Sequence, residues 1–179
     1  MKLKVLFVAL AVAAILPVAA LADPASASDK ANGARACQAL RAPTGLGEAT
    51  FKATYGTNAD KSNAMGKCVS AWTQTVHQNR HAAETACKAE QADAAFATAA
   101  GHDGKTFAQF YGGGKSAVSA LNRCIQSKQA AATAADKQDV VKAAKTCKAE
   151  RKSLGDVAFK TKYGTSNAFG KCVSKLASA

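Results

Sequence analysis

Phe159-Lys-Thr-Lys-Tyr163-Gly164 contains a pattern that occurs three times in the 179-residue chain. Phe-x-x-x-Tyr-Gly also begins at Phe51 and at Phe107. One cysteine lies upstream of each copy, and a second follows its tyrosine by 13 residues in the first two copies and by 9 in the third. Because an internal repeat indicates a repeated structural unit, we interpret the chain as three modules with two cysteines each.

The cysteines are expected to form disulfide bonds, since an even number in an exported chain is typical of a disulfide framework. The repeat favours pairing within modules, which closes loops with separations of 25 to 37 residues. Each such link contributes about 3–4 kcal/mol in the chain-entropy description. The predicted pairs are Cys37–Cys68, Cys87–Cys124 and Cys147–Cys172.

Large apolar residues are scarce after the first 22 positions. Alanine fills 44 of the 179 positions, whereas Leu, Ile, Val and Phe together supply 19 of the last 157 residues, about 12%. A chain with less than about 20% of these residues and a high net charge ordinarily lacks the apolar surface to fold. The disulfides are therefore expected to supply stability that the core does not.

Helices are predicted throughout the modules. Phe and Tyr four residues apart share one helical face, and the glycine that follows is the preferred residue for a left-handed C-terminal cap. Ser62 and Ser166 are candidate N-caps of the next helix in their modules. Glycine and proline are absent from 67–100 and 115–154, so two long helices are predicted, roughly 63–100 and 116–153.

We therefore predict an all-α fold of antiparallel up-and-down helices, two of them long, held by three disulfides within modules. Counting equally from a Cys87–Cys124 bridge sets Trp72 against Asp139 and the adjacent Val140, and lets the first and last modules share a core. An elongated chain of separate modules is the alternative. The predicted organisation is a signal peptide (1–22), a flexible linker (23–33) and three modules (34–72, 84–128 and 144–179) that form one helical domain over 34–179.

The first residues resemble a secretory signal peptide. Lys2 and Lys4 precede an apolar run from Val5 to Leu16, Pro17 breaks the run, and Ala20-Leu21-Ala22 offers small residues for cleavage. This segment predicts a secreted, periplasmic or cell-envelope protein cleaved near Ala22.

Two alternatives to cleavage at Ala22 stay open. Ala25-Ser26-Ala27 offers a second cleavage site, and an uncleaved apolar anchor is the other possibility, although Pro17 argues against it. No other segment of the sequence is apolar enough to span a membrane.

The strings Cys147-Lys-Ala-Glu150 and Asn167-Ala-Phe-Gly-Lys-Cys172-Val-Ser174 resemble a repeat found in secreted bacterial proteins, especially of the actinobacterial kind. The resemblance covers nearly all of residues 34–177. The second copy departs most, since Asn122 replaces a glycine. The resemblance implies export and a modular repeat, and no activity is assigned to these proteins.

The first long predicted helix carries one candidate metal site. His77, His81 and Glu84 are spaced to share a helical face, and two histidines four residues apart can bind Zn²⁺ or Cu²⁺. Arg80 nearby opposes a bound cation, and the motif lacks the glutamate that a metalloprotease carries after its first histidine. A solvated helix face is the competing interpretation.

Basic residues concentrate in the third module. The chain carries +12, and removing Lys2 and Lys4 leaves +10, of which residues 142–179 contribute +7. Such a concentration favours a polyanion, for example an anionic cell-wall polymer, lipid headgroups or nucleic acid. A charged face that only aids solubility is the alternative. The candidate contacts are Lys145, Lys148, Arg151, Lys152, Lys160 and Lys162.

Enzymatic chemistry is not expected. Every cysteine belongs to the repeat pattern, which leaves no free cysteine as a nucleophile, and no histidine recurs in the modules. The sequence also has no phosphate-binding loop after a strand. We expect a secreted, non-enzymatic helical protein without a cofactor that binds a polyanionic envelope component or another macromolecule through its basic third module. A metal-binding or stress-related periplasmic helical protein is the alternative.

Overall fold

The computed structural model describes residues 23–112 and 117–178, and this part of the chain is helical without any strand. The all-α prediction is confirmed, whereas the predicted signal peptide lies outside the described residues. None of the helices within the described ranges is both long and apolar enough to cross a membrane. The elements are α1 (Ala27–Arg41), α2 (Glu48–Tyr55), α3 (Ala64–Ala92), η1 (Phe96–Thr98), α4 (Phe107–Gly112), α5 (Ala117–Tyr163) and α6 (Ala168–Ala177).

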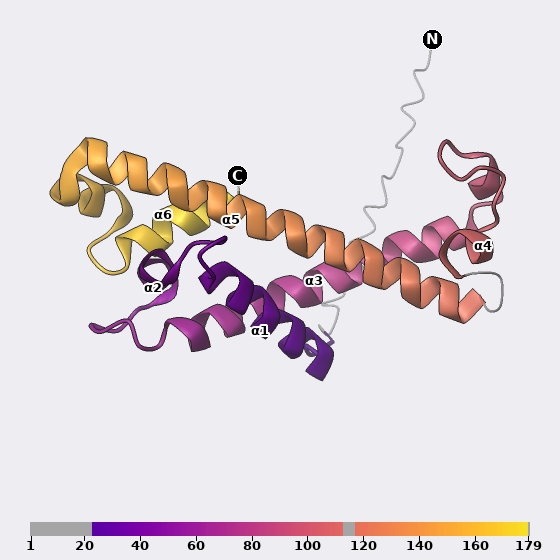
Figure 1. Ribbon diagram of the computed structural model, residues 1–179, viewed down its shortest axis with the longest axis horizontal. Helices are drawn as coiled ribbons and strands as arrows, with labels where there is room; N and C mark the ends of the chain where they lie inside the picture. The colour runs from indigo at the N-terminus through magenta and orange to yellow at the C-terminus, as the bar shows by residue number, and fades with distance from the viewer. Residues whose placement is uncertain (1–22, 113–116, 179) are drawn as a thin grey trace, which may run out of the picture.

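The two long helices, α3 and α5, cross one another and run in opposite directions (Figure 1). Near one end they are joined by the Cys87–Cys124 disulfide, where η1 and α4 complete the second module. Helices α1, α2 and α6 gather toward the other half of the pair. The molecule is therefore elongated, with the second module at one end and the first and third modules together at the other.

All three predicted disulfides are present. The Cα atoms are 5.9 Å apart in Cys37–Cys68 and 6.0 Å apart in Cys87–Cys124 and Cys147–Cys172. All six cysteines are fully buried. Each pair lies inside its own cluster of buried residues, so the three cores are each organised around one disulfide.

The first and third modules share part of their cores, as the sequence predicted. Leu46 and Val140 pack against both the cluster around Cys37–Cys68 and the cluster around Cys147–Cys172. Trp72 belongs to the first of these clusters, against which Val140 also packs. Helix α6 also approaches α2 so closely that a Cβ on Gly170 would lie 2.2 Å from the Thr54 carbonyl oxygen.

The predicted end of the first long helix, at residue 100, was wrong, whereas the predicted end of the second, at residue 153, lies close to a break in α5. Helix α3 ends at Ala92 because Asp93 leaves the helical conformation and its carboxylate accepts a hydrogen bond from Ala95 N (2.8 Å). Helix α5 reaches Tyr163, but it breaks at Gly155, whose φ of 77° lies in the left-handed region that favours glycine.

The predicted helix caps also need correction. The N-caps of α3 and α6 are Asn63 and Asn167, one residue later than the serines proposed from the sequence. Among the glycines after the tyrosines, Gly164 has a left-handed φ of 96°, whereas Gly56 has an extended φ of −72°. At Gly56 the requirement for glycine is steric, since a Cβ there would lie 2.7 Å from Lys52 O and from the Lys61 side chain.

The predicted flexible linker over 23–33 is wrong from residue 27 onward, because residues 27–33 form the first two turns of α1. Ser26 caps this helix in a capping box: its hydroxyl accepts from Asp29 N, and its own N–H donates to the Asp29 carboxylate. Asp29 is fully buried. Cleavage after Ala27 would remove the cap, whereas cleavage after Ala22 would retain it.

Gly33 sets the distance between α1 and α3, because a Cβ there would lie 2.8 Å from Thr73 N. We expect Gly33→Ala to lower the free energy of unfolding by about 1–3 kcal/mol, since the two backbones must separate. Gly66→Ala is the matched control: a Cβ on Gly66 would have no neighbour within 4 Å, so the substitution should stabilise α3 by about 0.5–1 kcal/mol. Urea unfolding measures both changes, and a stabilised Gly33→Ala variant would contradict this packing.

Candidate functional site

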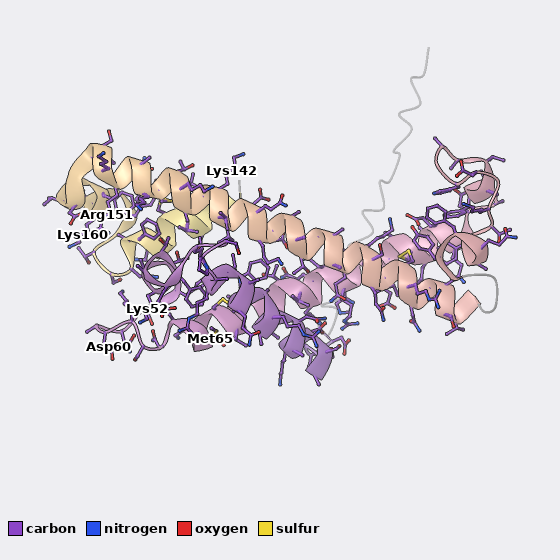
Figure 2. All side chains as sticks on the ribbon, in the orientation of Figure 1. Lys52, Asp60, Met65, Lys142, Arg151 and Lys160 are labelled. Atoms are coloured by element: carbon purple, nitrogen blue, oxygen red, sulfur yellow. A yellow bond between two sulfur atoms is a disulfide. The ribbon has the colours of Figure 1, made fainter. Side chains whose placement is uncertain are left out.

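The basic surface of the third module lies on the outer side of α5. Lys145, Lys148 and Lys152 are exposed and share one face because they are three and four residues apart. Ala143 and Cys147, on the opposite side of the helix, are buried. The disulfide core therefore fixes which face of α5 meets solvent, and Lys142 projects outward from the same helix (Figure 2).

The two acidic residues of the third module are both already paired. Glu150 accepts from Lys162 Nζ (2.6 Å) and from the Tyr163 hydroxyl (2.9 Å). Asp156 binds Arg151 through two hydrogen bonds of 2.6 and 3.1 Å. These bonds from Lys162 and Arg151 hold the pKa values of Glu150 and Asp156 below their ordinary range.

The six predicted contact residues therefore divide into two groups. Within the described part of the third module, ion pairs form at Arg151 and Lys162, whose charges are balanced locally. Lys160, beyond the break at Gly155, is exposed and lies near Arg151 in Figure 2. The exposed lysines that stay outside these pairs are Lys142, Lys145, Lys148, Lys152, Lys160, Lys171 and Lys175.

The aromatic residues of the third module serve the core. Phe159 is 1% exposed inside the cluster around Cys147–Cys172. Tyr163 packs against the same cluster and donates its hydroxyl to Glu150, and its partial burial raises its pKa. The second module repeats this arrangement, since Tyr111 donates to Glu90 (3.0 Å). These rings are therefore not available to stack on bases.

The predicted metal ligands do not assemble into a site. The rings of His77 and His81 do meet edge to face, with centroids 4.5 Å apart. Glu84, however, accepts from Lys88 Nζ (2.6 Å), and His77 Nδ1 lies 3.2 Å from an Asp29 oxygen. Over the described ranges, no group of three His, Cys, Asp or Glu side chains is placed to hold a metal ion.

The histidine face is instead part of a buried polar cluster that fastens α1 to α3. Arg80 Nε lies 3.3 Å from both oxygens of Asp29, and His77 approaches the same carboxylate. Burial of Asp29 opposes its ionisation, but hydrogen bonds with Ser26 and His77 and the charge of Arg80 outweigh this effect and lower its pKa.

The sequence interpretation missed this cluster because it treated the segment before residue 34 as a linker. One signal was present, since Ser26 and Asp29 have the spacing of a capping box. That spacing predicts the start of a helix, but it does not predict that Asp29 contacts His77 and Arg80, which lie 48 and 51 positions later in the chain.

An open groove of about 710 Å³ lies between α1, α3 and α5. Val76 and Ala36 are buried in its floor. A second cavity of about 420 Å³ lies between α1 and α5 on the side of the third module, and Lys137 lines both. The groove was not predicted, because it depends on how far apart α1 and α5 lie.

Comparisons with known proteins give no relative from which a function could be transferred: no family model, curated protein or solved structure matches the chain. The resemblance to secreted bacterial repeat proteins therefore stays a prediction.

Asp29→Asn tests the buried cluster. We expect this variant to lose about 2–3 kcal/mol of unfolding free energy at pH 7, because Arg80 and His77 lose their buried carboxylate. Since the folded-state pKa of Asp29 is lowered, its contribution is present above its unfolded pKa of about 3.9 and is lost as the pH falls through the folded value. The difference between the variant and the native protein should therefore shrink at acidic pH.

The matched control is Asp156→Asn, which removes an exposed ion pair and should cost less than about 1 kcal/mol. Denaturant unfolding from pH 7 down to pH 3 measures both variants. Equal stability of Asp29→Asn and the native protein at pH 7 would refute a fastening role for Asp29.

Proposed function

We propose that this is an exported, non-enzymatic protein that binds an anionic polymer of the cell envelope through the exposed lysines of α5. The observation that carries the proposal is the row of Lys145, Lys148 and Lys152 on the solvent face, in a module whose two acidic residues are already paired. The row keeps its positive charge available to an external anion.

The shape of the row favours a polymer over a small anion. From Lys142 to Lys152 the helix rises about 15 Å at ~1.5 Å per residue, so the charges are spread along a line rather than gathered in a pocket. Lysine is a flexible point charge and does not demand the paired geometry that arginine offers. A linear series of such charges suits an extended chain with an anion at each repeat.

Export is supported by two independent features. The three disulfides fit an oxidising compartment, where such bonds form and persist. The amino-terminal sequence fits a secretory signal peptide. An envelope polymer is consequently an anion that the mature protein would meet.

The test uses inorganic polyphosphate as a simple linear polyanion. We expect Lys145→Gln/Lys148→Gln/Lys152→Gln to weaken binding about tenfold or more at low salt and to reduce the slope of log K against log salt by about 2, if each lysine contributes roughly 0.7 as in single-stranded nucleic acids. Fluorescence anisotropy across a salt series measures both quantities.

The control variant, Lys30→Gln/Lys67→Gln/Lys105→Gln, removes the same charge from exposed positions on other segments. Its binding should change less than about threefold, because those lysines lie outside the row. Equal losses in the two triple variants would show that net charge alone attracts the polymer, and no loss in the first would exclude this surface.

A further inference from the structure

The lysine row continues a longer line of residues along α5 that are polar except for Val141. The positions that share this line are three or four residues apart, so each lies on the helix face next to the one before it. At ~1.5 Å per residue the line extends about 45 Å. Its members are Asn122, Gln126, Gln129, Thr133, Lys137, Val141, Lys145, Lys148 and Lys152.

The first half of this line forms one wall of the 710 Å³ groove. The opposite wall is a polar face of α1 that includes Ser28, Asn32 and Arg35, and Arg80 of α3 lies below. Cations, amides and hydroxyls line the groove together with apolar side chains that include Val76 and Ile125, and no carboxylate is among the described lining residues. The groove therefore offers hydrogen bonds and positive charge together.

The groove leads directly to the lysine row. Lys137 lines both the 710 Å³ groove and the adjoining 420 Å³ cavity, and Lys142 and Lys145 line the second one. Lys148 and Lys152 follow on the same face of α5. A chain lying in the groove would thus leave it over the row of lysines without changing direction.

Polar residues of α1 and α5 face one another across the groove. This is unusual, because facing helices in a domain ordinarily pack apolar side chains together. The amides of Asn122 and Gln126 are exposed, and Gln129 donates to the carbonyl of Val76 (3.2 Å). Such amides can both donate to and accept from hydroxyl groups. This half of the line is therefore matched to hydroxyls, whereas the lysine half is matched to anions.

We propose that the groove between α1 and α5 and the lysine row form one continuous track for a single extended polymer that alternates hydroxyl-bearing units with phosphate or carboxylate groups. This inference rests on the proposed function and adds the path and the chemical class of the ligand. No aromatic side chain lines either cavity among the described residues, so the track lacks the stacking surfaces with which proteins hold single-stranded nucleic acids.

The decisive variant is Ala130→Trp, which fills the groove without changing charge. Ala130 is exposed and lines the groove, whereas the neighbouring Ala131 is exposed and lies outside it, so Ala131→Trp is the matched control. The probes are a glycerol phosphate chain and a polyuronate chain, each long enough to cover the track. We expect Ala130→Trp to weaken binding of at least one probe about fivefold or more, and Ala131→Trp to change it less than twofold.

A second variant, Asn122→Ala/Gln126→Ala, tests hydroxyl recognition. It should weaken binding of the same probe several-fold and leave inorganic polyphosphate unchanged, since polyphosphate has no hydroxyl groups in its repeat. The probe that binds more tightly identifies phosphate or carboxylate as the preferred anion.

The outcomes separate the track from the proposed function. If the triple lysine variant loses binding while Ala130→Trp and Asn122→Ala/Gln126→Ala bind as the native protein does, the lysine row is a site and the track is wrong. If none of these variants loses binding, both proposals fail. Tighter binding of single-stranded DNA than of either probe would also overturn the assigned ligand class.

Discussion

The rest of the structure depends on the three disulfides, because they organise a chain with few large apolar residues. Each disulfide lies at the centre of one small buried cluster, and all six sulfurs are excluded from solvent. Leu, Ile, Val and Phe make up about 12% of the last 157 residues, well below the level at which a highly charged chain ordinarily folds. The bonds restrict the unfolded chain and thereby compensate for this small core.

This way of stabilising the fold affects the surface between the clusters. Helices α3 and α5 are joined at one end by Cys87–Cys124 and are packed at the other through the shared cores of the first and third modules. The middle of α5 consequently does not need a fully apolar face. Polar side chains from Asn122 to Lys137 can line an open groove there, supported below by the Asp29, His77 and Arg80 cluster that fixes α1 on α3.

The local parts of the fold were predictable, and the contacts across the molecule were mostly not. The repeat predicted the disulfide pairs because each module has its own two cysteines, and helix-forming residues predicted α3 and α5 because helix propensity is a property of neighbouring residues. The end of α3 at Ala92 depends on one aspartate side chain, and the role of Asp29 depends on residues about 50 positions away. The lysine row was predictable from the spacing of the lysines along one helix. The groove was not, because it depends on the distance between α1 and α5.

The most direct test of this account is thermal and denaturant unfolding of the protein before and after its six cysteines are reduced and alkylated. Three links of about 3–4 kcal/mol each would together contribute about 9–12 kcal/mol, which is comparable with the net stability of about 5–15 kcal/mol that is ordinary for a domain. We therefore predict that the alkylated chain loses its cooperative transition and most of its helical circular dichroism at 25 °C. An unchanged melting temperature and an unchanged helical signal would contradict the claim that the disulfides hold this fold together.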